Sequence, residues 1–235
     1  MPSNPQPILL LTRPEPASRR FAAEFDLPGV RLVISPVLRI IPVAHDAVRL
    51  SAARGLVFTS VNAVPAAGPG RGRPAICVGP ATAEAAQAAG YEVTVGPGDA
   101  ERMMPLLKGL DDGWLHPHGT HVARRLPVPG MVVYDQAPER LNAEAKEVLA
   151  GSAPVLLPLF SPRSARLLSP QAEDAQAPLW LAPISAAARG AWLGPASRIE
   201  LAPTPDADGI CYALSRLLAT EQSARGRVEA PRPGD

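Results

Sequence analysis

The chain has 235 residues, of which 46% are hydrophobic and 19% charged, which excludes extended disorder and leaves room for two domains of about 100 residues each. Its formal net charge of +1 argues against nucleic acid as a partner. Cys77 and Cys211 are far apart and outside any Cys-x-x-Cys spacing, which argues against a disulfide scaffold and a cysteine-based metal site. The N-terminus has neither a basic segment nor a long apolar run, so we expect a cytoplasmic protein without a membrane segment.

Short apolar runs alternate with helical segments along the chain. Strands are expected at residues 8–12, 31–35, 56–59, 75–78, 91–95, 114–116, 131–134, 155–160, 179–182 and 199–201. Helices are expected at residues 14–25, 80–90, 100–107, 121–126, 141–149, 161–168, 183–193 and 207–218. This alternation is typical of parallel sheets with helices on both faces. Residues 36–43 are apolar but bracketed by prolines, so we interpret them as an extended crossing segment.

Residues 74–95 carry the clearest local signals. An apolar strand stops at Gly79, Pro80 suits the first position of a helix, and Gly90 suits the left-handed residue that closes one. Such a turn leaves backbone N–H groups pointing outward at a helix N-terminus. The turn is therefore a candidate site for a carboxylate or a phosphate.

Segments in one part of the chain repeat segments in another part. LLLTRPEPASRRF from Leu9 lies over WLHPHGTHVARRL from Trp114, and residues 28–37 match residues 129–138. In addition, LVFTSVNAV resembles LPLFSPRSA, and AICVGPATAEAAQAAG repeats as WLAPISAAARGAWLG. The repeats imply one continuous five-strand unit in the middle of the chain and a second unit split between its two ends.

We therefore predict an α/β fold of two similar doubly wound parallel-sheet domains, joined by a two-segment linker, with a cleft between them. The predicted parts are a split domain at residues 1–36 and 142–220, a continuous domain at 43–134, linkers at 37–42 and 135–141, and a flexible tail at 221–235. Ligands bind at the carboxyl ends of parallel strands, so the cleft is the expected binding site.

The chain resembles the uroporphyrinogen-III synthase family in seven segments, which follow the family's order: LLLTRP, SPV, GLVFTSVNAV, ICVGPATAEAA, VVYDQAP, LFSPRSA and APTPDADG. The resemblance implies a monomeric lyase of tetrapyrrole biosynthesis that needs no cofactor. Its substrate would be hydroxymethylbilane, a linear tetrapyrrole that loses its hydroxyl as water and closes to uroporphyrinogen III with ring D inverted. A transient hand-over of this substrate from hydroxymethylbilane synthase is part of the same expectation.

Each ring of this substrate carries acetate and propionate groups, so the protein needs many anion contacts. Several helix N-termini, at roughly 0.3 to 1 kcal/mol each, can supply them without an excess of basic residues. Only two of the 23 basic residues are lysines, and the others are arginines. Arginine is suited to bind carboxylates, and the composition of the genome is an alternative explanation for this preference for arginine.

Tyr134 stands at the family's tyrosine position in the VVYDQAP segment. The resemblance implies that its phenol donates a proton to the departing hydroxyl, and packing of the linker is the alternative interpretation. Polar residues that follow strands can bind a carboxylate or cap a helix. On this ground and by the resemblance, substrate contacts are expected at Arg13, Ser35, Thr59, Ser60, Asn62, Gly79, Thr82, His118, Gly119, Ser161, Ser164 and Ser185.

Three histidines, His116, His118 and His121, suggest a metal site at first sight. No Cys, Asp or Glu lies near them in the sequence, so we predict no metal. His118 stands where the family often has arginine, and it is expected to contact a propionate.

The second copy of the Gly-Pro turn departs from the family. Ala182 and Ser185 stand where the family has Gly and Thr, and Ala182 is expected to restrict close approach of the substrate. These departures leave open a non-catalytic relative that binds tetrapyrroles or another anion. An unrelated two-domain anion receptor is a further alternative.

Overall fold

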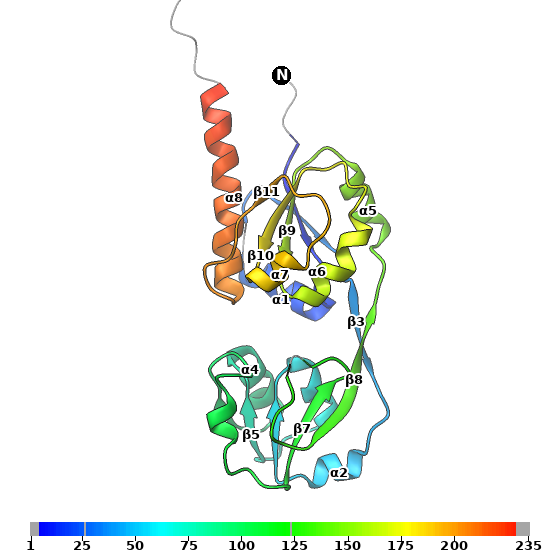
Figure 1. Cartoon of the computed structure of the whole chain (residues 1–235), viewed down its shortest axis with the longest axis vertical. Coiled ribbons are helices and arrows are strands. Elements are labelled where there is room, and N and C mark those ends of the chain that lie inside the picture. Colours follow the sequence, from blue (N-terminus) through cyan, green and yellow to red (C-terminus); the bar gives the residue numbers. More distant parts are fainter. Residues whose placement is uncertain (1–4, 26, 123, 229–235) are drawn as a thin grey trace, which may run out of the picture. The chain divides into compact units, whose positions relative to one another are not determined.

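The computed structural model describes residues 5–25, 27–122 and 124–228 and divides the chain into two compact domains (Figure 1). Domain 1 comprises Met1–Arg39 and Pro138–Asp235, and domain 2 comprises Ile40–Ala137. Each domain has its own largely parallel sheet, so the predicted α/β fold with two parallel-sheet domains is confirmed. The predicted cleft between the domains stays a prediction.

The sheet of domain 1 has five parallel strands in the order β11-β10-β9-β1-β2. Their bounds are β1 (Ile8–Leu11), β2 (Arg31–Ile34), β9 (Val155–Leu159), β10 (Leu179–Pro183) and β11 (Arg198–Ile199). Every residue of β1, β9 and β10 is buried. Such continuous apolar runs form central strands because helices cover both faces of the sheet.

Two groups of helices cover this sheet (Figure 1). On one face lie α1 (Glu15–Glu24) and α8 (Ala207–Val228). The opposite face is covered by α5 (Ala143–Ala150), α6 (Pro162–Leu168), α7 (Ala186–Gly190) and the 3₁₀ turn η3 (Ser169–Gln171). The domain is therefore a three-layer sandwich around one sheet.

The sheet of domain 2 has six strands in the order β3-β8-β7-β4-β5-β6. Their bounds are β3 (Leu38–Pro42), β4 (Gly55–Phe58), β5 (Pro74–Cys77), β6 (Glu92–Val95), β7 (Trp114–Gly119) and β8 (Gly130–Pro138). One face is covered by α2 (Ala47–Ala52), η1 (Val61–Ala63), α3 (Val64–Ala67) and α4 (Pro80–Ala88). The other face packs against η2 (Met104–Leu107) and the residues around it.

The two sheets repeat one strand order with different chain connections. The order β6-β5-β4-β7-β8 in domain 2 corresponds to β11-β10-β9-β1-β2 in domain 1. The register between neighbouring strands repeats as well. In domain 2, Gly55 of β4 pairs with Trp114 of β7. The residues aligned with these two in domain 1, Leu156 of β9 and Leu9 of β1, also pair with one another. The repeated sequence segments thus occupy equivalent strands of the two domains.

The segments predicted as linkers form paired strands. The backbone N–H of Val43 donates to the Val133 carbonyl (3.2 Å) and that of Glu139 donates to the Val37 carbonyl (2.9 Å). The later residue of the first segment, Val43, pairs with the earlier residue of the second segment, Val133, so β3 is antiparallel to β8. An edge strand tolerates the prolines that argued against a central strand.

Two predicted helices of domain 2 are wrong. Residues 121–126, apart from Ala123, which lies outside the described residues, contain no helix. Pro127 and Pro129 follow this segment and disfavour the helical conformation just before them. Residues 100–107 form turns and the 3₁₀ turn η2, because Pro105 removes a hydrogen-bond donor from the predicted helix. Helix α2, capped by the Asp46 carboxylate, was not predicted.

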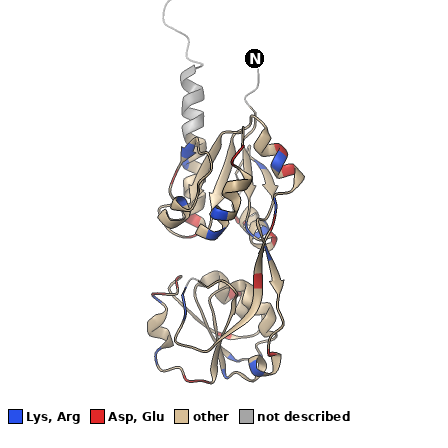
Figure 2. Cartoon of the chain, turned by 45° about the vertical axis from the view of Figure 1, so that its right-hand side comes forward, with Lys and Arg blue, Asp and Glu red and all other residues tan. Residues whose placement is uncertain are grey.

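The last helix is longer than predicted. Helix α8 continues to Val228, well into the segment predicted as a flexible tail, and residues 229–235 of that segment lie outside the described residues. Of the helices in the described residues, none is long and apolar enough to cross a membrane. Figure 2 shows acidic and basic residues interspersed over both domains.

Candidate functional site

Polar residues gather at the carboxyl edge of the domain 1 sheet. Because its strands are parallel, the residues that follow β1, β2, β9 and β10 lie at the same edge. These residues include the five predicted for this domain: Arg13, Ser35, Ser161, Ser164 and Ser185. The fold thus brings together predicted site residues that are up to 172 positions apart in the sequence.

The guanidinium of Arg13 is a cation at this edge that has no carboxylate partner among the described residues. Its guanidinium carbon lies 4.3 Å from the ring centroid of Phe160, a cation–π contact that orients the side chain. Among the described residues, none forms an ion pair or a hydrogen bond with the Arg13 side chain. Burial, and then repulsion by Arg20, lowers the pKa of Arg13, while Glu24 opposes this shift. A half-buried guanidinium with unused donors is suited to bind a carboxylate of a ligand.

Ser161, Ser164 and Ser185 make local hydrogen bonds at this edge. The Ser161 hydroxyl caps α6 by accepting the N–H of Ser164 (3.1 Å), and the two hydroxyl oxygens lie 2.8 Å apart. The Ser185 hydroxyl caps α7 by accepting the N–H of Ala188 (3.2 Å). Capping therefore accounts for these serines, although a hydroxyl that accepts an N–H keeps a proton that it can donate to a ligand.

Ser35 is buried and contributes to the fold. Its hydroxyl oxygen accepts the backbone N–H of Asn142 at 2.9 Å. The Asn142 side chain in turn caps α5 through the N–H of Ala145 (2.8 Å). Ser35 thus holds the start of α5 next to the end of β2.

The second copy of the proline turn differs from the prediction. Pro183 is predicted to open a helix, but it ends β10, and α7 begins only after Ser185, which is its N-cap. Ala182 is fully buried inside β10, so the prediction that it restricts the approach of a ligand is wrong. The strand continues past the aligned turn because its pairing with β9 extends to Pro183, opposite Leu159, whereas the equivalent pairing of β5 with β4 ends at Cys77.

The carboxyl edge of domain 2 collects the remaining predicted residues. Strands β4, β5 and β7 end at this edge, and Tyr134 of β8 pairs there with the last residue of β7. The residues concerned are Thr59, Ser60, Asn62, Gly79, Thr82, His118, Gly119 and Tyr134. Each domain therefore presents one cluster of predicted site residues at its own sheet edge.

The turn at Gly79 forms as predicted. Gly79 is the N-cap of α4, Pro80 is its first residue, and no side chain caps this end. Within the part of the chain that the structure describes, the backbone N–H groups of Ala81 and Thr82 have no acceptor. A Cβ at Gly79 would lie 3.2 Å from the Cα of Gly98, so the glycine allows the neighbouring loop to pack closely. The helix end offers two N–H groups to an anion.

Ser60 and Asn62 lie in the equivalent of the Ser161 turn. The Ser60 hydroxyl caps η1 by accepting the backbone N–H of Asn62 (3.2 Å), just as Ser161 caps α6 in domain 1. The repeat therefore places a serine cap at the same strand end in both domains.

Tyr134 packs its ring directly on Gly119. The Tyr134 side chain is 5% exposed, and a Cβ at residue 119 would lie 2.6 Å from the Cζ atom of its ring. Thr120 donates its N–H to the Tyr134 carbonyl (3.0 Å), and a register shift between β7 and β8 falls at this point. No residue in the described ranges forms a hydrogen bond with the phenol oxygen. Tyr134 lies inside β8 and not at a strand end as predicted, because β8 continues to Pro138.

His116 and His118 lie side by side on β7, with ring centroids 4.9 Å apart. His118 Nδ1 is 2.8 Å from the Gly119 carbonyl, which can only accept, so Nδ1 carries the proton. A neutral His118 therefore offers no second N–H to a carboxylate. His116 is buried, and its Nε2 lies 2.9 Å from the Thr59 hydroxyl oxygen. Burial, and then the neighbouring His118, lowers the pKa of His116 to about 4.

Two contacts at the site were missed by sequence reasoning. The Phe160 ring under Arg13 follows β9, and its only signal is an aromatic residue directly after a strand that pairs with β1. The hydrogen bond between Thr59 and His116 links two adjacent strands and had no signal in the sequence. Among the described residues, no group of three His, Cys, Asp or Glu side chains could hold a metal ion.

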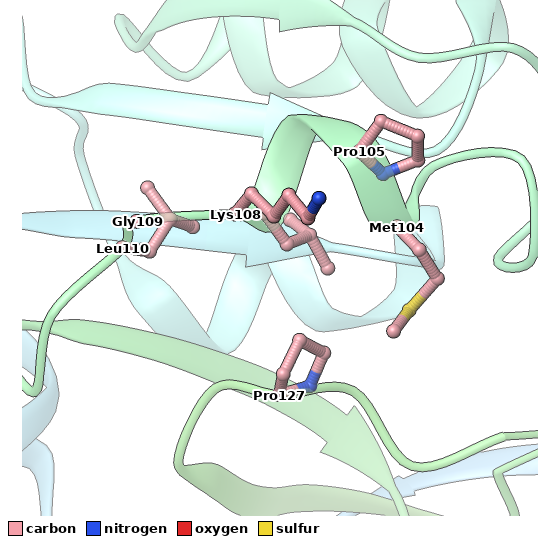
Figure 3. Close-up of a pocket in the computed structure, with 7 residues that line it drawn as sticks. Met104, Pro105, Lys108, Gly109, Leu110 and Pro127 are labelled. Atoms are coloured by element: carbon pink, nitrogen blue, oxygen red, sulfur yellow. The ribbon is translucent and has the colours of Figure 1, made fainter.

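A cavity of about 560 Å³ opens beside η2 in domain 2 (Figure 3). It is lined by Met104, Pro105, Leu107, Lys108, Gly109, Leu110 and Pro127. These residues precede β7 and β8 in the chain, and none of them is a predicted site residue. The cavity is therefore separate from the carboxyl edge described above.

Fold and site define a two-domain α/β protein with polar groups at the carboxyl edges of two repeated parallel sheets. A family model described as uroporphyrinogen-III synthase HemD matches residues 19–193, which is well over half of the chain. The chain therefore belongs to the uroporphyrinogen-III synthase family. A comparison with curated proteins found no match.

One solved structure in particular shares the fold. The crystal structure of uroporphyrinogen-III synthetase from Helicobacter pylori 26695 aligns over 91% of this chain and 100% of that chain, with a TM-score of 0.58 and 15% identity. A mutant uroporphyrinogen III synthase from the extremely thermophilic bacterium Thermus thermophilus aligns over 93% and 100%, with a TM-score of 0.49 and 13% identity. At 15% identity, the likeness to the Helicobacter pylori structure shows the fold alone.

Proposed function

We propose that the chain is an active uroporphyrinogen-III synthase, which dehydrates and cyclises hydroxymethylbilane to uroporphyrinogen III with inversion of ring D. The observation that carries the proposal is Tyr134: a buried phenol, unpaired among the described residues, at the carboxyl edge of a sheet in a chain of this family. Supply of the substrate by hydroxymethylbilane synthase is part of the proposal.

Tyr134 is proposed as the proton donor of the first step. The C–O bond of the hydroxymethyl group breaks as the phenol protonates the oxygen, so water leaves with the bonding electron pair and an azafulvene cation remains. Attack by ring D on this cation gives a spiro intermediate, which rearranges and closes the macrocycle. Loss of one proton from carbon then balances the proton donated at the start. The protein mainly has to orient the chain, since an activated nucleophile is not needed.

Arg13 is proposed to bind one substrate carboxylate from domain 1. Phe160 already orients the guanidinium, so binding needs little further ordering of the side chain. A hydrogen bond to a charged group contributes roughly 1.5 to 3 kcal/mol. Arg13 is thus the strongest single anion contact that we propose in this domain. The hydroxyls of Ser161 and Ser185 add donors, whereas the Ser164 hydroxyl already donates to the Ser161 carbonyl (3.1 Å).

In domain 2 the N-terminus of α4 is proposed to bind a second carboxylate. The N–H groups of Ala81 and Thr82 are available there, and a helix end contributes roughly 0.3 to 1 kcal/mol to a nearby anion. The hydroxyls of Thr59 and Ser60 and the amide of Asn62 lie at the same edge and are proposed as further contacts.

The alternative is a relative of the family that binds a tetrapyrrole or another anion without turnover. The proposed anion contacts would be the same, so only product analysis separates the two. Purified protein is given freshly prepared hydroxymethylbilane, the products are oxidised, and the porphyrin isomers are separated. Isomer III above the level of the enzyme-free reaction supports the proposal. Isomer I alone, together with retained binding of uroporphyrin, would support the non-catalytic relative.

Replacing Tyr134 with phenylalanine tests the role of the phenol. General acid catalysis contributes typically 10²- to 10⁴-fold, so turnover of Tyr134→Phe should fall by about 10²-fold or more. The ring remains, so the circular dichroism spectrum and the urea midpoint should match the wild type. Unchanged turnover would remove Tyr134 from the mechanism.

A further inference from the structure

The Thr59 hydroxyl has an immediate partner that is buried in the sheet. Thr59 directly follows β4, and His116 lies on the adjacent strand β7. The Nε2 atom of His116 is 2.9 Å from the Thr59 hydroxyl oxygen, and the His116 side chain is only 3% exposed. His116 is therefore too deeply buried to be a ligand contact itself, and Thr59 is the hydrogen-bonding group that it reaches at this sheet edge.

The imidazole of His116 is neutral near pH 7. Burial is the main cause, followed by the nearby His118 ring, and together they place the pKa of His116 at about 4. A neutral imidazole has one nitrogen that donates and one that accepts. The bond to Thr59 can therefore run in either direction, depending on which nitrogen carries the proton.

The direction of this bond decides what Thr59 presents to a ligand. If Nε2 accepts, the hydroxyl proton of Thr59 is used, and only oxygen lone pairs remain, which repel a carboxylate. If Nε2 carries the proton and donates, the hydroxyl proton is free for a carboxylate. The donors His116 and Thr59 then form a chain in which each hydrogen bond strengthens the next.

We propose that His116 is a positioning residue, which donates from Nε2 to Thr59 and so orients the threonine hydroxyl to donate to a substrate carboxylate. This inference rests on the proposed function for the chemistry of the ligand. It assigns to the pair of Thr59 and His116 the anion contact that the sequence assigned to His118. His118 is placed differently, because its Nδ1 faces the Gly119 carbonyl and its Nε2 lies next to Gly130.

The tautomer of His116 is measured directly by long-range ¹H–¹⁵N correlation spectra of the imidazole nitrogens. The full chain is used at neutral pH, free and with uroporphyrin as a polycarboxylate probe, and His116→Gln assigns the signals. We expect a protonated Nε2 and an unprotonated Nδ1 in the bound state. A protonated Nδ1 in the bound state overturns the inference.

A double-mutant cycle tests the coupling between the two residues. Loss of one oriented hydroxyl donor should weaken uroporphyrin binding about five- to tenfold in His116→Leu and in Thr59→Val. His116→Gln, which keeps a donor, should restore part of this loss. The double variant should bind as weakly as either single one, and additive losses overturn the inference. The exposed His121, changed to leucine, is the control.

These readouts do not need turnover. If the wild type forms only isomer I, the proposed function fails, whereas the tautomer and the coupling still report on His116. If the wild type forms isomer III but His116 carries its proton on Nδ1, the inference about His116 fails alone. Should His116→Leu not fold, the spectra of the wild type still decide.

Discussion

Replacing Gly119 with alanine is expected to displace Tyr134. A Cβ at residue 119 would lie 2.6 Å from Cζ of the Tyr134 ring and 3.0 Å from the phenol oxygen. Carbon atoms in favourable contact are about 3.5 to 4.0 Å apart, so the ring has to move by about 1 Å. Gly119 of β7 and Tyr134 of β8 are both buried, so the movement of the ring strains the packing between these two strands.

The effect should appear in both stability and turnover. Overpacking of this kind costs about 1 to 3 kcal/mol of the free energy of unfolding. A displacement of about 1 Å of a catalytic group can reduce turnover about 10²-fold. Gly119→Ala is therefore expected to lower the urea midpoint and the rate at which isomer III forms.

Gly190 provides a matched control for this substitution. It is the last residue of α7, and a Cβ there would have no neighbour within 4 Å. Gly190→Ala should therefore leave both turnover and stability close to the wild-type values. If the Tyr134 ring causes the strain, Gly119→Ala should cost less stability in a Tyr134→Ala background. An equal cost in both backgrounds, or a Gly119→Ala variant as stable and active as Gly190→Ala, would refute the reasoning.

Three further predictions concern charge, titration and capping. Arg13→Gln should raise KM about tenfold or more with little change in kcat, because it removes a carboxylate contact, whereas Arg19→Gln, on the exposed side of α1, should change neither. The pKa of His116 is about 4 in the folded chain, against an ordinary value of 6.5. Between these two pH values, His116 is therefore protonated only in the unfolded chain. Stability should therefore fall by about 3 kcal/mol as the pH drops from 6.5 to 4, and urea midpoints should show that His116→Gln flattens this dependence while the exposed His121→Gln does not. Ser161→Ala should lower the free energy of unfolding by about 1 kcal/mol through loss of the α6 cap, while Ser197→Ala, on an exposed bend, should be neutral; equal values for the two would contradict the capping role.

The fold could be predicted because its local signals repeat. Apolar runs mark the buried strands, and the aligned segments LVFTSVNAV and LPLFSPRSA place Ser60 and Ser161 as caps at equivalent strand ends. The turn at Gly79 was predictable for the same reason, since glycine and proline act through their own backbone. These features depend on residues that are close in sequence.

The failures have tertiary causes. Pro183 aligns with Pro80, yet its pairing with Leu159 of β9 extends β10 through it, and the helix starts only at Ala186. The prolines predicted an extended crossing segment, but the pairing of β3 with β8, which joins segments about 90 residues apart, had no local signal.

At the site, the residue types and their strand ends could be predicted, but their partners could not. Phe160 under Arg13 and His116 beside Thr59 are contacts between different strands, which the register decides. The same register places Nδ1 of His118 against the Gly119 carbonyl, a contact without a signal in the sequence, and the anion contact of His118 stays a prediction.

The isomer composition formed from fresh hydroxymethylbilane decides whether the protein is an active uroporphyrinogen-III synthase. Wild-type protein at increasing concentration is mixed with the substrate, the reaction is stopped by oxidation at short times, and isomers I and III are quantified. We expect isomer III to rise in proportion to the protein and to displace isomer I, with Tyr134→Phe giving far less at equal concentration. Isomer I alone, at the enzyme-free rate and at every protein concentration, would contradict it.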